Sequence, residues 1–479
     1  MGLASVMEFG GSVGVGARVA DTIRTKVVDT SLFKDDPAML MLGMVCAVTA
    51  SSIYLTFATR IGLPVSTTHS IMGGVIGMGV ASVGASGVQW VGKGSGTGVI
   101  NAGVVQVFLA WILAPGIAAC FGAIIFLITK FGVMLRKNPV YKALFLVPIY
   151  FGITAALLTM LLLWKGGSYT VTLNNAEIVG TIIGVGAAWA LVVAIFFCPW
   201  LYRKVIKDDW QLKLWHVPLG PLLLRRGDPP PPPADWHGGI RNYYEGHLTK
   251  EELEARRAHQ AGVRIVNDEE AAAPGQEKQI NPDDNTSTDA DPYEHVPESH
   301  KKIVGPKPEG AWYNGSVLFW YVKYALFRGV DKDVVNMQKK KDILSGDVEE
   351  MHARAAHYNN KAEYMYSFLQ VMTASTASFT HGANDISNAI GPYATIYQIW
   401  NEGTLPETGK SHVPIWILVF GGSALAIGLW TYGYNIMKNL GNRITLHSPS
   451  RGFSMELGSV ITIVMATRLS KSNCIATCN

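Results

Sequence analysis

The chain has 479 residues, of which 49% are hydrophobic and 16% are charged, whereas soluble domains average about 25% charged residues. This composition excludes an ordinary soluble enzyme, and the formal net charge of +4 is too small to indicate nucleic-acid binding. The charges are concentrated in residues 202–362, which contain 23 of the 40 Lys and Arg and 25 of the 36 Asp and Glu. This profile is typical of a multi-pass membrane protein interrupted by one hydrophilic loop.

Six apolar stretches are long enough, at about 20 residues, to cross a bilayer as helices. They cover residues 39–59, 99–129, 143–164, 176–200, 413–437 and 452–469. Small residues recur within them, as expected where transmembrane helices pack closely. The sequence therefore predicts an all-α transmembrane bundle. Its parts are an N-terminal half at 1–201, a hydrophilic loop at 202–362, a C-terminal half at 363–469 and an atypical tail at 470–479.

Basic residues predict the orientation of the bundle. Four follow the stretch 99–129 and four follow the stretch 176–200, with two spans between the clusters. Both clusters therefore lie on the same side, which the excess of Lys and Arg marks as cytoplasmic. The loop 202–362 is then cytoplasmic, and its proline-rich and acidic stretches predict that it is largely disordered, with short helices near 249–260 and 331–357.

The first motif is Gly62-Leu-Pro-Val-Ser-Thr-Thr-His69. Pro64 suits the first turn of a helix, so Ser66, Thr67 and Thr68 bring three hydroxyl groups to one helix start. Free N–H groups and the positive end of the helix dipole make such a start suitable for an anion. A self-capped helix at the membrane surface is an equally good interpretation of these residues.

The second motif is Thr380-His-Gly-Ala-Asn-Asp-Ile-Ser-Asn-Ala-Ile-Gly-Pro392, in which Asp385 is the only acid between Glu363 and Glu402. A single carboxylate at membrane depth is costly and is functional by default. Asp385 and Asn388 share a helix face, and Gly382, Gly391 and Pro392 predict breaks on either side. Oxygen groups beside a broken helix suit a hard cation such as Na⁺. The alternative is a carboxylate paired with a basic residue of a neighbouring helix.

Together the two motifs indicate coupling. The carboxylate of Asp385 would repel an anion held nearby at the helix start, and a bound cation would remove this repulsion. Each ion then favours the binding of the other, which is a physical basis for cation-coupled anion transport.

The two ends of the chain also match each other, which indicates an internal repeat. Phe9-Gly-Gly-Ser12 corresponds to Phe420-Gly-Gly-Ser423, and Ala58-Thr-Arg60 corresponds to Ala466-Thr-Arg468 at a nearly constant offset. Weak repeats of this kind are typical of transporters built from two related halves.

The motifs at 382–392 and 63–69 resemble the two signatures of the inorganic phosphate transporter family, and the fungal phosphate permeases most of all, over residues 1–215 and 361–469. The resemblance implies a phosphate symporter with an inverted repeat and re-entrant, broken helices. It implies that Na⁺ or H⁺ is the coupling ion and that no other cofactor is needed. By position, Ser66, Thr67, Thr68, Asn384 and Asp385 would bind phosphate, and Asp385 and Asn388 would bind Na⁺.

The chain departs from the family pattern, in which each half carries both motifs. The first half lacks a Gly-Ala-Asn-Asp motif, and the second half continues after Leu469 into an unrelated tail instead of a second Pro-Val-Ser-Thr-Thr. These departures predict a chain truncated at both ends.

The function expected is cation-coupled phosphate uptake across the plasma membrane, with phosphate, Na⁺ or H⁺ and membrane lipid as partners and a homodimer as an option. A phosphate-sensing receptor that signals through the loop is the alternative from another class, and an inactive truncated paralogue or gene-model fragment is the third. His69 and His381 adjoin the motifs without a set of catalytic partners, so an enzyme is not expected.

Overall fold

The structure is a computed structural model. It describes residues 1–25, 27–61, 63, 65–92, 103–165, 173–233, 239–240, 242–244, 247–258, 304–327, 348–405, 413–439 and 445–473. Every regular element in these ranges is helical, and the extended backbone forms only an isolated bridge between Val28 and Val88. The prediction of an all-α bundle is therefore confirmed.

The N-terminal part of the chain contains α1, the apolar helices that follow it and the short helix α8 at the start of the hydrophilic loop. Their bounds are Gly2–Thr25 for α1, Pro37–Ile61 for α2, Thr67–Val83 for α3, Gly103–Thr129 for α4, Pro139–Lys165 for α5, Asn175–Val192 for α6, Cys198–Leu201 for α7 and Gly220–Leu223 for α8. The segments Lys130–Met134, Val193–Phe197 and Tyr202–Ile206 are π-helical, so that α4 and α6 continue as longer helical rods.

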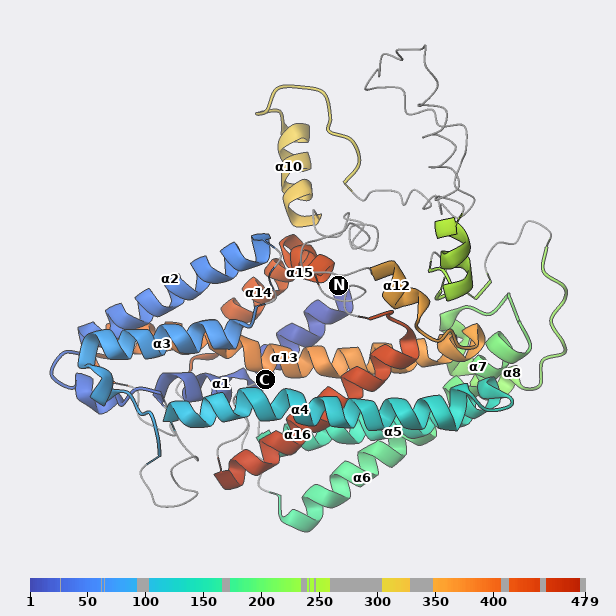
Figure 1. Cartoon of the computed structure of the whole chain (residues 1–479), viewed down its shortest axis with the longest axis horizontal. Helices are drawn as coiled ribbons and strands as arrows, with labels where there is room; N and C mark the ends of the chain where they lie inside the picture. Colours follow the sequence, from blue (N-terminus) through green and yellow to red (C-terminus); the bar gives the residue numbers. More distant parts are fainter. Residues whose placement is uncertain are drawn as a thin grey trace.

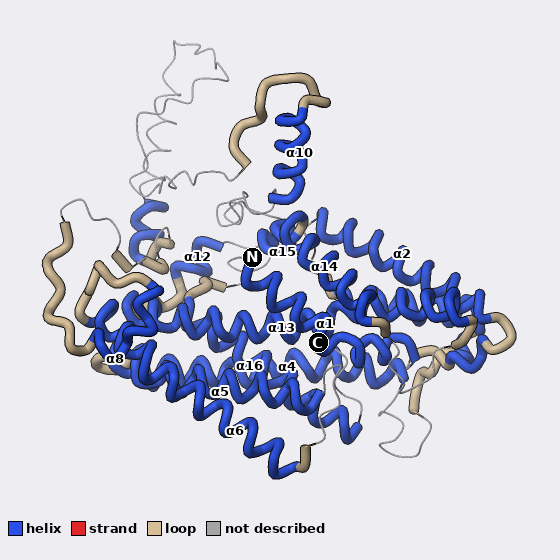
Figure 2. Tube along the Cα trace, turned by 180° about the vertical axis from the view of Figure 1, so that it is seen from behind, coloured by secondary structure: helices blue, strands red, loops and turns tan. Residues whose placement is uncertain are grey.

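The second half begins with one very long helix. The bounds of the remaining helices are Gly315–Phe327 for α10, Val348–Ala353 for α12, Asn360–Glu402 for α13, Ile415–Thr431 for α14, Gly433–Asn439 for α15 and Pro449–Asn473 for α16. Figure 1 shows α13 running along the middle of the bundle, with α4, α5 and α16 on one side and α2 and α14 on the other. Figure 2 shows the same arrangement from behind.

Among the residues that the structure describes, four helical segments are long and apolar enough to cross a membrane, and they match four of the six predicted spans. They are Pro37–Ile61, Gly103–Met134, Pro139–Leu163 and Asn175–Ile206. The predicted span at 413–437 is divided between the shorter apolar helix α14 and α15. The predicted span at 452–469 lies within α16.

The predicted helix breaks at Gly382, Gly391 and Pro392 are wrong, because α13 is continuous through all three residues. Gly382 is used for close helix packing instead. A Cβ atom at Gly382 would overlap the backbone carbonyl of Glu8 in α1, and one at Gly11 would overlap the carbonyl of Phe379. The Ser12 hydroxyl then donates to the Gly382 carbonyl at 3.0 Å. Glycine here brings two helix backbones together, as in other tightly packed membrane helices.

The matching segments of the two chain ends lie against each other. Phe9 and Ser12 of α1 face Gly422 of α14, where an added Cβ would lie 3.1 Å from the Phe9 ring and 3.3 Å from the Ser12 Cβ. Helices related by a pseudo-twofold axis pack in this way when the axis runs between them. The inverted repeat itself stays a prediction.

The hydrophilic loop contains ordered pieces that dock on the bundle. Residues 250–258 form a helix within the predicted range 249–260, and α12 lies within the predicted range 331–357, whereas the acidic stretch 267–295 lies outside the described residues. Thr249 and Glu252 form a reciprocal cap, in which the Thr249 N–H donates to Glu252 at 2.8 Å and the Glu252 N–H donates to the Thr249 hydroxyl at 3.4 Å.

Tyr244 of this loop connects the starts of α13 and α16 through a buried carboxylate. Its hydroxyl donates to Glu363 Oε1 at 2.9 Å and accepts the backbone N–H of Tyr358 at 3.1 Å. Glu363, which is fully buried, also accepts the N–H of Ser450 at the start of α16 at 2.8 Å. Burial, and then the negative charge of Glu363, raise the pKa of Tyr244, so the phenol stays a neutral donor at working pH.

We expect Tyr244→Phe to destabilise the folded chain. The substitution leaves the Glu363 carboxylate one donor short in a buried position, and a lost hydrogen bond to a charged group costs about 1.5–3 kcal/mol. Thermal unfolding of the purified protein measures the effect, with Tyr313→Phe as the control, because Tyr313 is highly exposed. Equal losses in the two variants would show that the Tyr244 hydroxyl contributes nothing specific.

Candidate ion-binding site at the start of α3

The start of α3 places three consecutive hydroxyl groups at a helix N-terminus. Ser66 has an extended backbone, with φ −109° and ψ 126°, and its hydroxyl accepts the N–H of His69 at 3.4 Å. Thr67 and Thr68 form the first turn. The helix is therefore capped by its own Ser66, while the positive end of its dipole remains directed at this point. Pro64, which is predicted to start the helix, lies outside the described residues.

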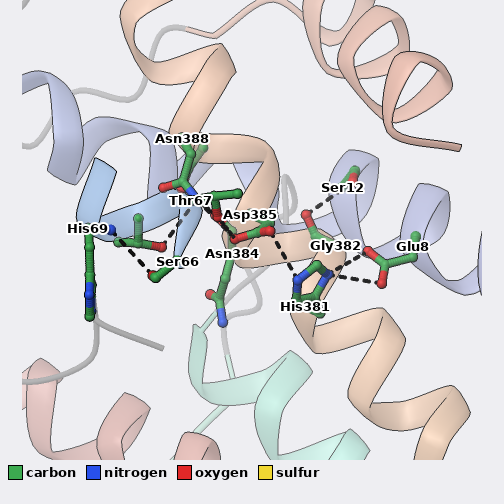
Figure 3. A network of polar contacts seen from close by, with 12 residues as sticks. Glu8, Ser12, Ser66, Thr67, His69, His381, Gly382, Asn384, Asp385 and Asn388 are labelled. Atoms are coloured by element: carbon green, nitrogen blue, oxygen red, sulfur yellow. Dashed lines mark hydrogen bonds and ion pairs between the residues drawn. The ribbon is translucent and has the colours of Figure 1, made fainter. Parts of the chain in front are cut away.

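Asp385 of α13 lies directly at this helix start, although the two motifs are 318 positions apart in sequence. The Thr67 hydroxyl donates to Asp385 Oδ1 at 2.9 Å (Figure 3). Asn388, one turn along α13, donates through Nδ2 to the same carboxylate oxygen at 2.9 Å. The structure thus brings together the candidate residues Thr67, Asp385 and Asn388.

The Asn388 amide nitrogen lies within a group of three oxygen atoms. Besides Asp385 Oδ1, it donates to Thr67 Oγ1 at 3.0 Å and to Thr68 Oγ1 at 3.2 Å. A carboxylate and two hydroxyl groups are the hard oxygen ligands that a small cation prefers. The amide NH₂ of Asn388 occupies the point between these three oxygens, so a cation would bind there only after the Asn388 side chain moves aside.

The second oxygen of Asp385 takes part in a chain of ionisable groups that the sequence analysis missed. His381 Nε2 lies 3.0 Å from Asp385 Oδ2, and its Nδ1 lies 3.0 Å from Glu8 Oε1 in α1. Among the described residues, the basic partner of Asp385 is thus a residue of its own helix, four positions earlier, whereas the alternative interpretation expected one on a neighbouring helix. Two sequence signals were available, because the spacing of His381 and Asp385 places them on one helix face and Glu8 is the only acid before Asp21.

Asn384 is not part of this cluster. Figure 3 shows its side chain pointing away from Thr67 and Asp385, and its backbone carbonyl accepts the Ser387 hydroxyl. The candidate role of Asn384 in phosphate binding stays a prediction, and in this structure the side chain does not share the contacts of Asp385.

Two separate cavities meet the site from different sides. One, of about 470 Å³, is partly polar and is lined by Ser51, Tyr54, Ser66, His69 and Ser70 together with small residues of α2 and α3. The other, of about 380 Å³, is almost wholly apolar and contains Asp385 among residues of α2, α13 and α14. Ser66 therefore lines the polar cavity, whereas Asp385 lines the apolar one. Thr67, at the start of α3, contacts Asp385 between them.

We expect Thr67→Val to weaken the site and Thr67→Ser to preserve it. Valine keeps the side-chain shape but removes the hydroxyl that donates to Asp385, and hydrogen bonds to charged groups contribute about 1.5–3 kcal/mol, or tenfold or more in affinity. Phosphate uptake at limiting Na⁺, the activity that the resemblance of the motifs implies, measures the effect. An equal loss in the Ser and Val variants would mean that the methyl packing of Thr67, and not its hydroxyl, is what matters.

Comparison with known proteins gives the chain a family. A model of the phosphate transporter family matches residues 1–477. The phosphate-repressible phosphate permease pho-4 of Neurospora crassa is 67% identical, over 98% of this chain and 80% of its own length. The sodium-dependent phosphate transporter 2 of Felis catus is 25% identical, over 98% of this chain and 83% of its own length. A solved structure titled the sodium-dependent phosphate transporter has a TM-score of 0.49 and 20% identity, over 99% of this chain and 77% of that one.

The chain belongs to the phosphate transporter family. It is therefore a transporter protein and not an enzyme, and its apolar helices make it a multi-pass membrane protein. The resemblance of its two motifs to the signatures of this family is confirmed.

Proposed function

We propose that this chain is a cation-coupled inorganic phosphate symporter of the plasma membrane, which moves phosphate into the cell by alternating access. The observation that carries the proposal is the contact between the two motifs, in which the only acid of residues 364–401 accepts a hydrogen bond from the first turn of α3. The family membership and the phosphate permease of Neurospora crassa support phosphate as the substrate.

Phosphate would enter the polar cavity at the start of α3. Ser66, His69 and Ser70 line this cavity, and the helix dipole adds positive potential at the same end. An anion beside Ser66 lies one residue from Thr67, whose hydroxyl donates to Asp385. The negative charge of Asp385 therefore opposes the binding of the anion. In a low-dielectric environment this repulsion is much larger than in water.

A cation at the three oxygens of Asp385, Thr67 and Thr68 would cancel this charge. The anion and the cation then bind cooperatively, and neither ion alone drives the conformational change efficiently. Movement of α3 against α13 would open the site to alternate sides, since the two ligand sets come from different halves of the chain. The named sodium dependence of related transporters favours Na⁺ as the coupling ion.

Uptake of radiolabelled phosphate tests the proposal. The chain is expressed in cells that lack their own phosphate transporters, and uptake is compared in Na⁺ and in choline, at neutral and acidic pH. Uptake that requires Na⁺ supports a sodium symporter, and uptake that follows pH alone assigns H⁺ as the coupling ion. Surface-expressed protein that binds phosphate but moves none would overturn symport in favour of a sensor.

A further inference from the structure

Residues 213–225 form a surface whose chemistry is not explained by transport. This surface consists of the 3₁₀-helix Leu214–Leu219, helix α8 and their flanking basic residues, directly after the long helical segment Asn175–Ile206. Five large apolar side chains on it are between 46% and 68% exposed, namely Leu214, Trp215, Leu219, Leu222 and Leu224. Figure 1 shows α7 and α8 at one end of the bundle.

The segment is held firmly, so the exposure of these side chains is a property of the fold. The Trp200 indole N–H donates to the Lys213 carbonyl at 3.1 Å, and the Lys204 ammonium donates to the Leu212 carbonyl at 3.2 Å. Leu212 and Leu223 are buried in the core beside Trp200. A Cβ atom at Gly220 would overlap the backbone of Phe196, so the segment lies directly on the span.

The surface continues the lipid-facing side of a membrane span. Val192, Ile195 and Phe196 are exposed on the segment Asn175–Ile206, and Gly220 packs against Phe196. The leucines of the 213–225 surface therefore adjoin apolar side chains that face lipid. Trp215 suits the boundary between acyl chains and headgroups, where tryptophan is enriched.

The surface is positive because residues 213–225 contain Lys213 and Arg225 but no acid, and the acids on either side of it are already paired. Asp209 contacts Arg203 at 3.6 Å and Arg226 at 4.0 Å, and Asp228 contacts Lys207 at 3.1 Å. Within the described ranges, neither Lys213 nor Arg225 takes part in an ion pair, and Lys213 lies 4.9 Å from the centre of the Trp215 ring. Both basic side chains are thus available to an anion at the edge of the apolar surface.

We propose that the 213–225 surface binds anionic phospholipid of the cytoplasmic leaflet. Trp215 and the leucines enter the boundary between headgroups and acyl chains, and Lys213 and Arg225 contact the headgroups. The cytoplasmic leaflet carries the anionic lipids, and the basic clusters of this chain predict that this end faces it. The combination of an apolar face with basic residues beside it is typical of segments that lie in the membrane interface.

A fluorescent probe at position 215 of the full chain tests the proposal. The five cysteines are replaced by alanine, Trp215→Cys is labelled with an NBD fluorophore, and phosphate uptake confirms that the labelled chain is folded. The protein is reconstituted into phosphatidylcholine vesicles that contain a small equal fraction of either doxyl-labelled phosphatidylserine or doxyl-labelled phosphatidylcholine. Quenching of NBD then reports which lipid lies beside residue 215.

The expected result is strong quenching, with a preference for phosphatidylserine of about fivefold for each basic residue that contacts its headgroup. The Lys213→Glu, Arg225→Glu double variant should lose this preference, and the Lys250→Glu, Lys307→Glu control, with the same charge change in the hydrophilic loop, should keep it. Equal quenching by the two lipids in the unsubstituted background would overturn the recognition of anionic headgroups. An unquenched probe would overturn the lipid contact and assign the surface to water or to a protein partner.

Discussion

The Asp385→Asn variant is expected to lose the cation dependence of phosphate uptake and most of the uptake itself. Asparagine has nearly the same shape and keeps an oxygen that can accept the Thr67 hydroxyl, so the helix contact survives. The negative charge is lost, and with it both the attraction for a cation and the repulsion of phosphate. Coupling between two sites is commonly worth about 5–150-fold in affinity, and this factor should disappear.

The measurement is initial uptake of radiolabelled phosphate as a function of Na⁺, at matched surface expression. Glu402→Gln is the control, because it removes an exposed acid at the far end of the same helix and should leave uptake unchanged. Retained Na⁺ activation in Asp385→Asn would exclude this carboxylate as the cation ligand. Phosphate binding without Na⁺ is expected to persist in the variant, since the polar cavity at Ser66 is untouched.

The Gly11→Ala variant is expected to lose the folded state of the bundle to a large extent. Its new Cβ would overlap the carbonyl group of Phe379, which is backbone and cannot move aside as a side chain can. Overpacking of a close contact costs about 1–3 kcal/mol and more where the neighbour is rigid. Separation of α1 from α13 would also displace Glu8 from His381.

Gly14→Ala is the matched control for Gly11→Ala, because it lies one turn further along α1 and an added Cβ there meets no atom within 4 Å. Thermal unfolding in detergent and the yield of monodisperse protein measure the difference. Equal behaviour of the two variants would show that the close approach of α1 and α13 is not required for folding.

Local chemistry made much of the candidate site predictable. Asp385 is the only acid between Glu363 and Glu402, and Asn388 follows it at a spacing that shares its helix face, so their pairing could be predicted from helix geometry. The hydroxyl groups at 66–68 indicate a helix start, because Ser and Thr are favoured at the N-cap. The direct contact of Thr67 with Asp385 follows from tertiary packing across 318 positions, and only the idea of coupling between the motifs anticipated it.

Packing also explains what the sequence did not reveal. Gly382 and Pro392 are helix breakers by propensity, but a helix buried in the middle of a bundle is stabilised on all sides, and Gly382 is needed for contact with α1. Glu8 reaches His381 because α1 packs closely against α13. No local sequence pattern predicts that these two helices are neighbours. In the hydrophilic loop, Tyr244 contacts Glu363, which lies 119 positions later in the sequence. The composition of the loop predicts only a polar segment and does not predict this contact.

The most direct test of the central claim is the affinity of the purified protein for phosphate with and without Na⁺, measured by titration calorimetry with choline as the replacement cation. Coupling through Asp385 should raise the affinity for phosphate by about 5–150-fold when Na⁺ is present. Reciprocally, saturating phosphate should raise the affinity for Na⁺ by the same factor. Equal phosphate affinities in the two salts, in protein that still transports phosphate, would contradict cation coupling at this site.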